Sequence, residues 1–474
     1  MALISSHIFR NLGYMAVAQV AAGICGFFTL VVLSRALGPA NFGILGFGTA
    51  VLAFVGLLTT LGTDQYGARE ISRAEGPVGR ICARLVGLRL VLAAVSYLAL
   101  LAFAAWGNRG STEADILMIQ GTGVFVTALT LDFIFQGMRR LEWVAVRQIA
   151  TAAIVLAAAF FLVHGAGDLY AAAWIYPIAG AAVVIVVLVA GVRRVIAFRL
   201  DGPAAGLGTI MSAVVPIAVS GTMQAVILNT DVVMLGLFRD NEEVGLYTAI
   251  MRLVLFALMP AGLVVAAMFP ELARKMDSPT AMRDGAKQFA TLLLFIGFPL
   301  PCLVLIVPEQ TVGLIYGESF MAATAVVAPM MSFVLIIYLR MIFGTPLVAW
   351  NMERQHMKLS ILAAVTNVVL NAALIPSYGM LGAVAASLAS QVVAMLGYGW
   401  VFRRHVGELI CRVPFMVALC AGGASLVTMA CLSALDARLG GIHALAYLAI
   451  AGTVFGWSYL AGGYFLVRPL WRQD

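Results

Sequence analysis

The sequence predicts an all-α integral membrane protein with about fourteen transmembrane helices, each near the 20 apolar residues that a bilayer crossing needs. The first observation is composition. Of the 474 residues, 62% are hydrophobic and only 11% are charged, and the mean hydropathy is +1.01. Soluble domains carry about 25% charged residues, so a soluble fold is excluded. The second observation is that the apolar residues gather into long runs separated by short polar turns, and the third is how the basic residues alternate between those turns.

The apolar runs locate the helices along the chain. The first six span residues 11–34, 41–62, 84–106, 115–137, 146–165 and 169–192. The next six span 209–238, 244–269, 288–307, 321–346, 357–376 and 379–402, and the last two span 411–434 and 443–467. The first run is too long for the hydrophobic region of a cleavable signal peptide. The six cysteines have no metal-ligand spacing, so they are interpreted as small core residues.

The basic residues predict the orientation of the helices. Most of the 29 Lys and Arg residues lie in one set of alternating loops, which includes both ends of the chain. The opposite loops hold only Arg35, Arg109, Arg239 and Arg438. Because basic loops stay on the cytoplasmic side, both termini are predicted to be cytoplasmic, in agreement with an even number of helices.

An internal repeat divides the chain into lobes. Phe42-Gly43-Ile44 matches Val244-Gly245-Leu246, and Arg69-Glu70-Ile71-Ser72-Arg73 matches Pro270-Glu271-Leu272-Ala273-Arg274 at nearly the same offset. Each half has an even number of helices, so the repeat is parallel and its axis follows the membrane normal. We therefore expect two six-helix lobes, residues 1–200 and 201–405, with a central site between them, and an appended helix pair in residues 406–474.

The hairpin at the centre of the chain carries the most informative charges. Its arms, residues 209–238 and 244–269, hold Asp231 and Arg252 at similar depths, about 10–15 Å from the turn at 1.5 Å per residue. A charge there costs several kcal/mol unless it is paired or faces water. Arg252 could hold an anionic ligand, with Asp231 pairing with it or exchanging a proton or sodium ion. Alternatively, the two form a buried ion pair that fastens their helices, or a salt bridge that opens as the protein rearranges.

Further polar residues inside the predicted helices are candidates for binding or coupling. Asp132 and Gln136 share one face of the fourth helix, near the depth of Arg89. Asp132 beside Arg89 could be a cation-coupling site, or these charges could neutralise one another near the membrane surface. Asp64, at the end of the second helix, is interpreted as positioning that helix at the interface.

The remaining candidates each have a functional and a structural interpretation. Arg340 could line an inner vestibule and attract an anion, or extend to the interface. Asn229, Asn367 and Asn371 could line a cavity wetted by sugars, but bonds between packed helices are the preferred interpretation for them.

Several stretches together resemble one family. They are Leu33-Ser34-Arg35-Ala36-Leu37-Gly38-Pro39, Phe135-Gln136-Gly137, Asp231 with Leu235-Gly236, Phe269-Pro270-Glu271, Tyr316-Gly317-Glu318-Ser319-Phe320, and Asn371 with Ile375-Pro376-Ser377-Tyr378-Gly379. In order and spacing, residues 8–400 resemble the polysaccharide-transport family, the flippases for lipid-linked O-antigen and exopolysaccharide units. The family shares a superfamily with the multidrug and toxin extruders and the lipid II flippase. The resemblance implies two lobes around a central cavity, alternating access, and a polyprenyl-pyrophosphate-linked oligosaccharide as cargo.

These observations favour a transporter in the bacterial cytoplasmic membrane over an enzyme. The sequence has no phosphate-binding P-loop and no sizeable loop with paired carboxylates, so we expect coupling to H⁺, Na⁺ or the cargo gradient and no cofactor. Arg252, Arg340, Arg89, Asn229 and Gln136 are the candidate cargo-binding residues, and Asp231 and Asp132 the candidates for ion coupling or gating.

Two rival functions are open on sequence grounds. The nearer is a cation-coupled exporter of small molecules, although a cavity for cations should be net acidic. The more distant is a membrane polysaccharide polymerase, whose catalytic residues the short outer loops do not supply. The expected partners are the lipid-linked oligosaccharide, the membrane, and possible polymerase or co-polymerase proteins. No nucleic-acid partner is expected.

Overall fold

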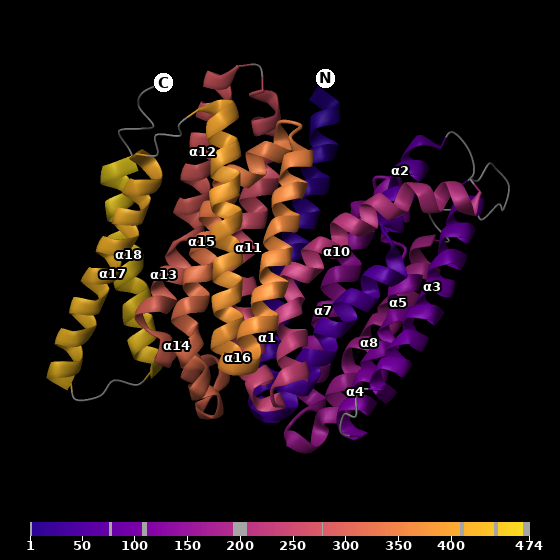
Figure 1. Cartoon of the computed structure of the whole chain (residues 1–474), viewed down its shortest axis with the longest axis horizontal. Coiled ribbons are helices and arrows are strands. Elements are labelled where there is room, and N and C mark those ends of the chain that lie inside the picture. The colour runs from indigo at the N-terminus through magenta and orange to yellow at the C-terminus, as the bar shows by residue number, and fades with distance from the viewer. Residues whose placement is uncertain are drawn as a thin grey trace. The chain divides into compact units, whose positions relative to one another are not determined.

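The computed structural model describes residues 2–74, 78–106, 111–192, 206–276, 278–407, 412–439 and 444–467. Within these ranges the chain is helical and has no strand, and its helices correspond to the fourteen predicted from the apolar runs (Figure 1). Nine of the described helices are long and apolar enough to cross a membrane by length and composition. The predicted fold class is therefore confirmed.

The chain forms two compact units, Met1–Gly245 and Leu246–Asp474. The helices that begin in the first unit are α1 (Ala2–Thr60), α2 (Thr63–Arg73), α3 (Gly79–Trp106), α4 (Ser111–Gly121), α5 (Gly123–Leu129), α6 (Asp132–Gly137), α7 (Leu141–Leu162), η1 (Ala166–Asp168), α8 (Leu169–Val187), η2 (Leu188–Val192), α10 (Leu207–Phe238) and α11 (Asn241–Arg274). The second unit continues α11 and adds α12 (Pro279–Gly297), α13 (Pro299–Ile306), α14 (Pro308–Tyr316), η3 (Glu318–Ala323), α15 (Thr324–Ala349), α16 (Glu353–Val406), α17 (Arg412–Leu439) and α18 (Ala444–Val467).

Two of these helices are hairpins with a sharp turn at a glycine. α1 has 59 residues and α16 has 54, far more than the roughly 20 that cross a bilayer. Gly38 breaks α1 at φ 74°, and Gly379 breaks α16 at φ 55°, a region of backbone space that glycine enters without steric cost. Each hairpin therefore supplies two of the predicted helices, and the breaks at Gly38 and Gly379 lie at the boundaries between those helices.

In the first unit, α1 packs against α3, α7 and α10. The second arm of α1 also meets the first turn of α11 at two glycines that the sequence repeat makes equivalent. A Cβ on Gly43 would overlap the carbonyl oxygen of Asn241, and a Cβ on Gly245 would overlap that of Pro39. Each glycine thus approaches the residue four positions before the other, so this contact has the two-fold relation that the repeat predicts.

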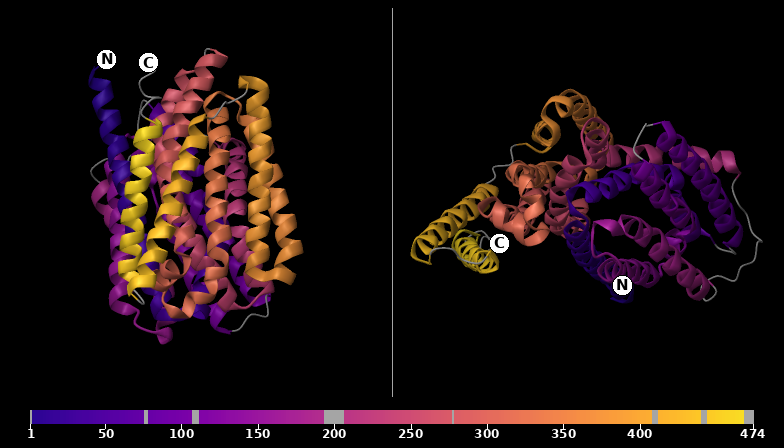
Figure 2. Two further views of the ribbon diagram at one scale, coloured as in Figure 1. Left: turned by 90° about the vertical axis from the view of Figure 1, so that its left-hand side faces the viewer. Right: turned by 90° about the horizontal axis from the view of Figure 1, so that it is seen from below.

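In the second unit, α15 packs along α16, and the α17–α18 pair packs on α12, α13 and α14 (Figures 1 and 2). Three aromatic side chains fasten α11 to this unit through its backbone. Tyr316 Oη donates to the Ala249 carbonyl at 2.7 Å, Tyr338 Oη to that of Ala257 at 2.8 Å, and Trp350 Nε1 to that of Leu272 at 2.9 Å. Buried polar tips of aromatic residues find partners in this way.

Two of the longer segments between predicted membrane-spanning helices are themselves partly helical. Residues 63–83 hold the short helix α2 and the first turn of α3, and residues 270–287 hold the end of α11 and the start of α12. The sequence repeat assigns α10 to the second predicted lobe, residues 201–405. In the structure, α10 instead packs on α1 inside the first compact unit. The lobe boundary at residue 200 itself stays a prediction.

Candidate functional site

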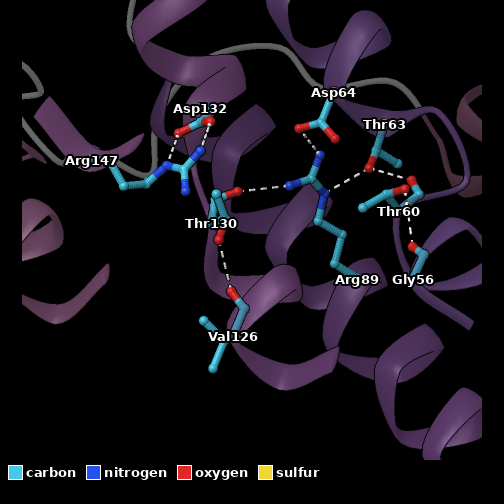
Figure 3. Close-up of polar contacts among 9 residues, drawn as sticks. All are labelled: Gly56, Thr60, Thr63, Asp64, Arg89, Val126, Thr130, Asp132 and Arg147. Carbon is cyan, nitrogen blue, oxygen red and sulfur yellow. Dashed lines mark hydrogen bonds and ion pairs between the residues drawn. The ribbon is translucent and has the colours of Figure 1, made fainter. Parts of the chain in front are cut away.

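A fully buried arginine lies at the centre of a polar cluster in the first unit. Arg89 lies on α3 with 0% of its surface exposed. Its guanidinium donates from Nη2 to Asp64 Oδ1 at 2.6 Å, from Nε to Thr63 Oγ1 at 2.6 Å, and from Nη1 to the Thr130 carbonyl at 2.9 Å (Figure 3). Its Cζ lies 4.6 Å from the ring centroid of Phe133. The charge is thus compensated by three hydrogen bonds, one of which is to a carboxylate.

Two breaks in the helices bring these oxygens to Arg89. Between α1 and α2 the backbone turns through Leu61 at φ 42° and Gly62 at φ 74°, which places Thr63 and Asp64 in the first turn of α2. Between α5 and α6 it is extended at Thr130, where ψ is 111°. A break of this kind exposes backbone carbonyls that a continuous helix would satisfy internally. Arg89 therefore supplies a donor at a carbonyl that the break exposes.

The carboxylate of Asp132 pairs with a different arginine from the one expected. Arg147 on α7 forms a bidentate ion pair with it. Nε donates to Oδ1 at 2.7 Å and Nη2 donates to Oδ2 at 2.6 Å (Figure 3). Asp132 therefore does not form an ion pair with Arg89, whose carboxylate partner is Asp64. Asp64 lies in the first turn of α2 and its side chain keeps 37% of its surface exposed, so its interpretation as a residue that positions the helix end at the interface stays a prediction. Gln136, one turn after Asp132 on α6, has an exposed side chain.

Close packing of α2 on α6 sets the position of this cluster. A Cβ on Gly67 would overlap the ring of Phe133, and a Cβ on Gly137 would overlap Ile71. Glycine at both positions lets the two short helices approach closely. Phe133 can therefore lie flat enough against Arg89 for a cation–π contact while Asp64 reaches the same guanidinium.

The two charges of the central hairpin fall in different units. Asp231 on α10 belongs to the first unit and is 1% exposed, and its Oδ1 accepts the Val232 N–H at 3.0 Å. Asn229, half-buried on the same helix, donates to the Ala225 carbonyl at 3.1 Å. Arg252 on α11 belongs to the second unit. The pairing of Asp231 with Arg252 stays a prediction.

Arg252 and Arg340 differ from Arg89 in their burial and in their ion pairing. Both are half-buried, and no carboxylate in the described part of the chain forms an ion pair with either. The electrostatic neighbour of Arg252 is the phenol of Tyr316. A cation at membrane depth without a carboxylate is costly, which makes each of the two a candidate for an anion brought from outside.

Arg340 lies on α15 against an aromatic group. Its Cζ is 5.8 Å from the ring centroid of Tyr398, and its Nε is enclosed with no hydrogen-bond partner among the described residues. Tyr398 Oη donates to the His356 carbonyl at 3.2 Å and lies 2.8 Å from Ser360 Oγ. The tyrosine is therefore held in place by its own bonds and gives Arg340 a fixed surface to pack on.

The two asparagines of the predicted eleventh helix form a short chain of bonds, of which one crosses the α16 hairpin. Asn371 Nδ2 donates to Asn367 Oδ1 at 3.0 Å, and Asn367 Nδ2 donates to Ser387 Oγ at 3.2 Å. All three side chains are buried. This agrees with the interhelical interpretation, since amide and hydroxyl groups commonly join helices inside membranes.

Sequence reasoning missed Asp64, Thr63, Thr130 and Arg147 as members of the cluster. Leu61-Gly62 was a signal for a helix end, since glycine at a helix terminus indicates a turn. Thr130 and Leu131 carry no comparable signal, and the break between α5 and α6 follows from tertiary contacts. Arg147 follows Arg139 and Arg140 in a basic loop and was therefore interpreted with them as an orientation signal.

Comparison with known proteins identifies a family and relatives with similar sequences. Residues 8–276 match the model of the family described as polysaccharide biosynthesis protein. A protein from Haloferax volcanii named as a low-salt glycan biosynthesis flippase is 22% identical over 165 residues, which cover 34% of this chain and 35% of that one. A protein from Escherichia coli K12 named as an O-antigen transporter is 24% identical over 174 residues, which cover 35% of this chain and 41% of that one. The matches thus span well under half of these relatives.

Solved structures show the same fold over most of the chain. The lipid II flippase MurJ in an inward closed conformation has a TM-score of 0.74 at 13% identity, covering 96% of this chain and 99% of that one. An inward-facing multidrug transporter of the MATE family has a TM-score of 0.64 at 13% identity, covering 83% and 98%. Because the family model matches more than half of the chain, this protein belongs to the polysaccharide biosynthesis protein family.

Proposed function

We propose that the protein is a flippase that moves a polyprenyl-pyrophosphate-linked oligosaccharide across the membrane by alternating access, for assembly of a surface polysaccharide. Family membership, a relative named as a glycan biosynthesis flippase, and the fold of a lipid II flippase support this. The observation that carries the proposal is the presence of Arg252 and Arg340, two arginines at membrane depth that no described carboxylate neutralises.

The chemistry of the cargo complements these two residues. A pyrophosphate carries several negative oxygens, and guanidinium binds phosphate oxygens with two parallel hydrogen bonds. In this proposal Arg252 and Arg340 hold the pyrophosphate, the glycan follows it through the protein, and the prenyl tail stays in lipid. Asn229 and Gln136 are proposed to contact the glycan, and Arg89 would join them only if its buried cluster opened.

The setting of the transporter is part of the proposal. Both termini are cytoplasmic, the membrane is the bacterial cytoplasmic membrane, and a polymerase or co-polymerase uses the product on the outer side. Coupling to H⁺ or Na⁺ is proposed at the buried carboxylate of Asp231. Asp132 is the weaker candidate, because Arg147 occupies both of its oxygens.

Deletion of the gene, followed by labelling of lipid-linked oligosaccharides and assay of surface polymer, tests the proposal. The flippase predicts accumulation of the pyrophosphate-linked precursor and loss of surface polymer. Complementation with Arg252→Ala should fail, whereas Arg354→Ala, which changes an exposed arginine at the start of α16, should restore both. Unchanged polymer with increased sensitivity to organic cations would instead indicate a small-molecule exporter and overturn the proposal.

A further inference from the structure

The surroundings of Arg89 have the composition of a cation site. Three kinds of oxygen converge on the guanidinium, a carboxylate from Asp64, a hydroxyl from Thr63 and a backbone carbonyl from Thr130 (Figure 3). Hard cations in proteins take this mixture of ligands. We call these three residues the oxygen cage. It lies where two helices are interrupted, and in transporters interrupted helices supply the carbonyls that coordinate ions.

The guanidinium itself is enclosed, although one member of the cage reaches the surface. Arg89 and Thr63 are both 0% exposed, and the ring of Phe133 covers one face of the guanidinium, whereas the Asp64 side chain keeps 37% of its surface exposed. Thr63 can accept from Arg89 because its own hydroxyl hydrogen is donated to the Thr60 carbonyl. The hydroxyl oxygen is therefore oriented as a ligand toward the cation, and no part of the guanidinium is left to reach a solute.

The neighbouring ion pair differs in the oxygens that surround its arginine. Asp132 and Arg147 meet only through one carboxylate and one guanidinium, and Arg147 keeps 20% of its side-chain surface exposed whereas Arg89 keeps none. No backbone carbonyl or hydroxyl among the described residues completes that pair in the way that Thr130 and Thr63 complete the cage. It serves as a matched comparison for an ordinary salt bridge on the adjacent helices.

We propose that Arg89 is a tethered cation, which permanently fills a monovalent-cation site in the first unit. The guanidinium takes the place that a free ion would hold between the two helix breaks, and it cannot leave during a transport cycle. The first unit then needs no free ion to keep α2 and α6 together. Any ion coupled to transport binds elsewhere, and this last statement alone rests on the proposed function.

Chemical rescue of purified protein in cargo-free nanodiscs tests the proposal without a transport assay. Arg89→Ala empties the cage and should lower the melting temperature, and millimolar guanidinium or Na⁺ should restore most of the loss relative to choline, since a ligand of the folded state raises its stability. Arg147→Ala should show no such rescue. Asp64→Asn added to Arg89→Ala should abolish it. No difference between guanidinium, Na⁺ and choline would overturn the proposal.

A second pair of variants keeps the test decisive if Arg89→Ala does not fold. Arg89→Lys retains a cation, and Arg89→Gln retains a polar side chain of similar length without charge. A tethered cation predicts that the lysine variant melts well above the glutamine variant, and that guanidinium raises only the latter. Equal melting temperatures would show that Arg89 acts through packing and hydrogen bonding alone.

Discussion

Arg89 in the first unit and Arg340 in the second are both arginines at membrane depth, but their surroundings differ. Arg89 is fully enclosed and has a carboxylate, a hydroxyl and a carbonyl within hydrogen-bond distance. Arg340 has an aromatic ring beside it, an enclosed Nε without a partner, and no carboxylate among the described residues. Arg252 resembles Arg340, because no carboxylate in the described ranges forms an ion pair with it.

The difference separates two uses of a buried cation. An arginine whose charge is compensated inside the fold stabilises that fold, and removing its partner costs several kcal/mol. An arginine whose charge is not compensated inside the fold reduces stability and is retained for a ligand that compensates it. Burial alone therefore does not identify a binding residue, and the presence or absence of internal partners is the more informative observation.

The largest expected effect comes from removing the carboxylate of the compensated arginine. Asp64→Ala leaves the buried guanidinium of Arg89 without its carboxylate. Because the Asp64 side chain keeps 37% of its surface exposed, we expect a loss of about 3 kcal/mol of stability, the lower end of the range for breaking a buried ion pair. Equilibrium unfolding in detergent measures it. Replacing both residues, as Asp64→Ala with Arg89→Met, should recover part of the loss. A double variant with the summed loss of the two single variants would contradict the pairing.

Substitution by methionine should change stability in opposite directions at Arg340 and at Arg89. Arg340→Met keeps an apolar chain against Tyr398 and removes an uncompensated charge, so we expect stability to rise by about 1 kcal/mol. Arg89→Met should lower stability, because Asp64 and the Thr130 carbonyl lose their donor. Thermal unfolding of both variants in one detergent gives the comparison. Destabilisation of similar size at both positions would contradict the distinction between an arginine compensated inside the fold and one that is not.

A smaller effect is expected at the Asp132–Arg147 pair. Arg147→Lys keeps the charge but replaces two parallel hydrogen bonds by one, and we expect a loss of about 1–2 kcal/mol. High salt should reduce the difference from the native protein, because this pair keeps some exposure to solvent. If Arg147→Lys were as damaging as Asp64→Ala, the stability of this pair would not differ from that of the Arg89 cluster, and the comparison would fail.

The smallest effect is expected from the ring beside Arg340. Tyr398→Phe keeps the aromatic face and removes the hydroxyl that bonds the His356 carbonyl and approaches Ser360. We expect a loss of about 0.5–1.5 kcal/mol and unchanged cargo affinity. A marked fall in cargo affinity would mean that the phenol hydroxyl contacts the cargo directly.

The sequence predicted the helices and the hairpin turns for direct physical reasons. Long apolar runs have few alternatives to membrane-spanning helices, because unsatisfied backbone groups are too costly in lipid. Gly38 and Gly379 lie at positions where an L-residue with a side chain would be strained, and each follows an apolar run of spanning length. These are local signals, and the structure bears them out.

The pairing of charges could not be predicted in the same way. Arg89 and Asp64 are 25 residues apart, and their contact depends on Leu61, a residue with a side chain held at φ 42°. Asp132 and Arg147 are 15 residues apart, and Arg139 between them is also left-handed, at φ 57°. Left-handed conformations of residues other than glycine are sparse and depend on tertiary contacts. Periodicity places a residue at a depth, but it does not select a partner among several arginines at that depth.

The most direct test of the account measures the binding of a short-chain polyprenyl pyrophosphate, and of the corresponding alcohol, to the protein in nanodiscs. The account predicts that the native protein prefers the pyrophosphate. The double variant Arg252→Ala with Arg340→Ala should lose at least about tenfold of that preference, or 1.4 kcal/mol, and Arg147→Lys should keep it. A double variant with the full native preference would contradict the claim that the uncompensated arginines hold the cargo.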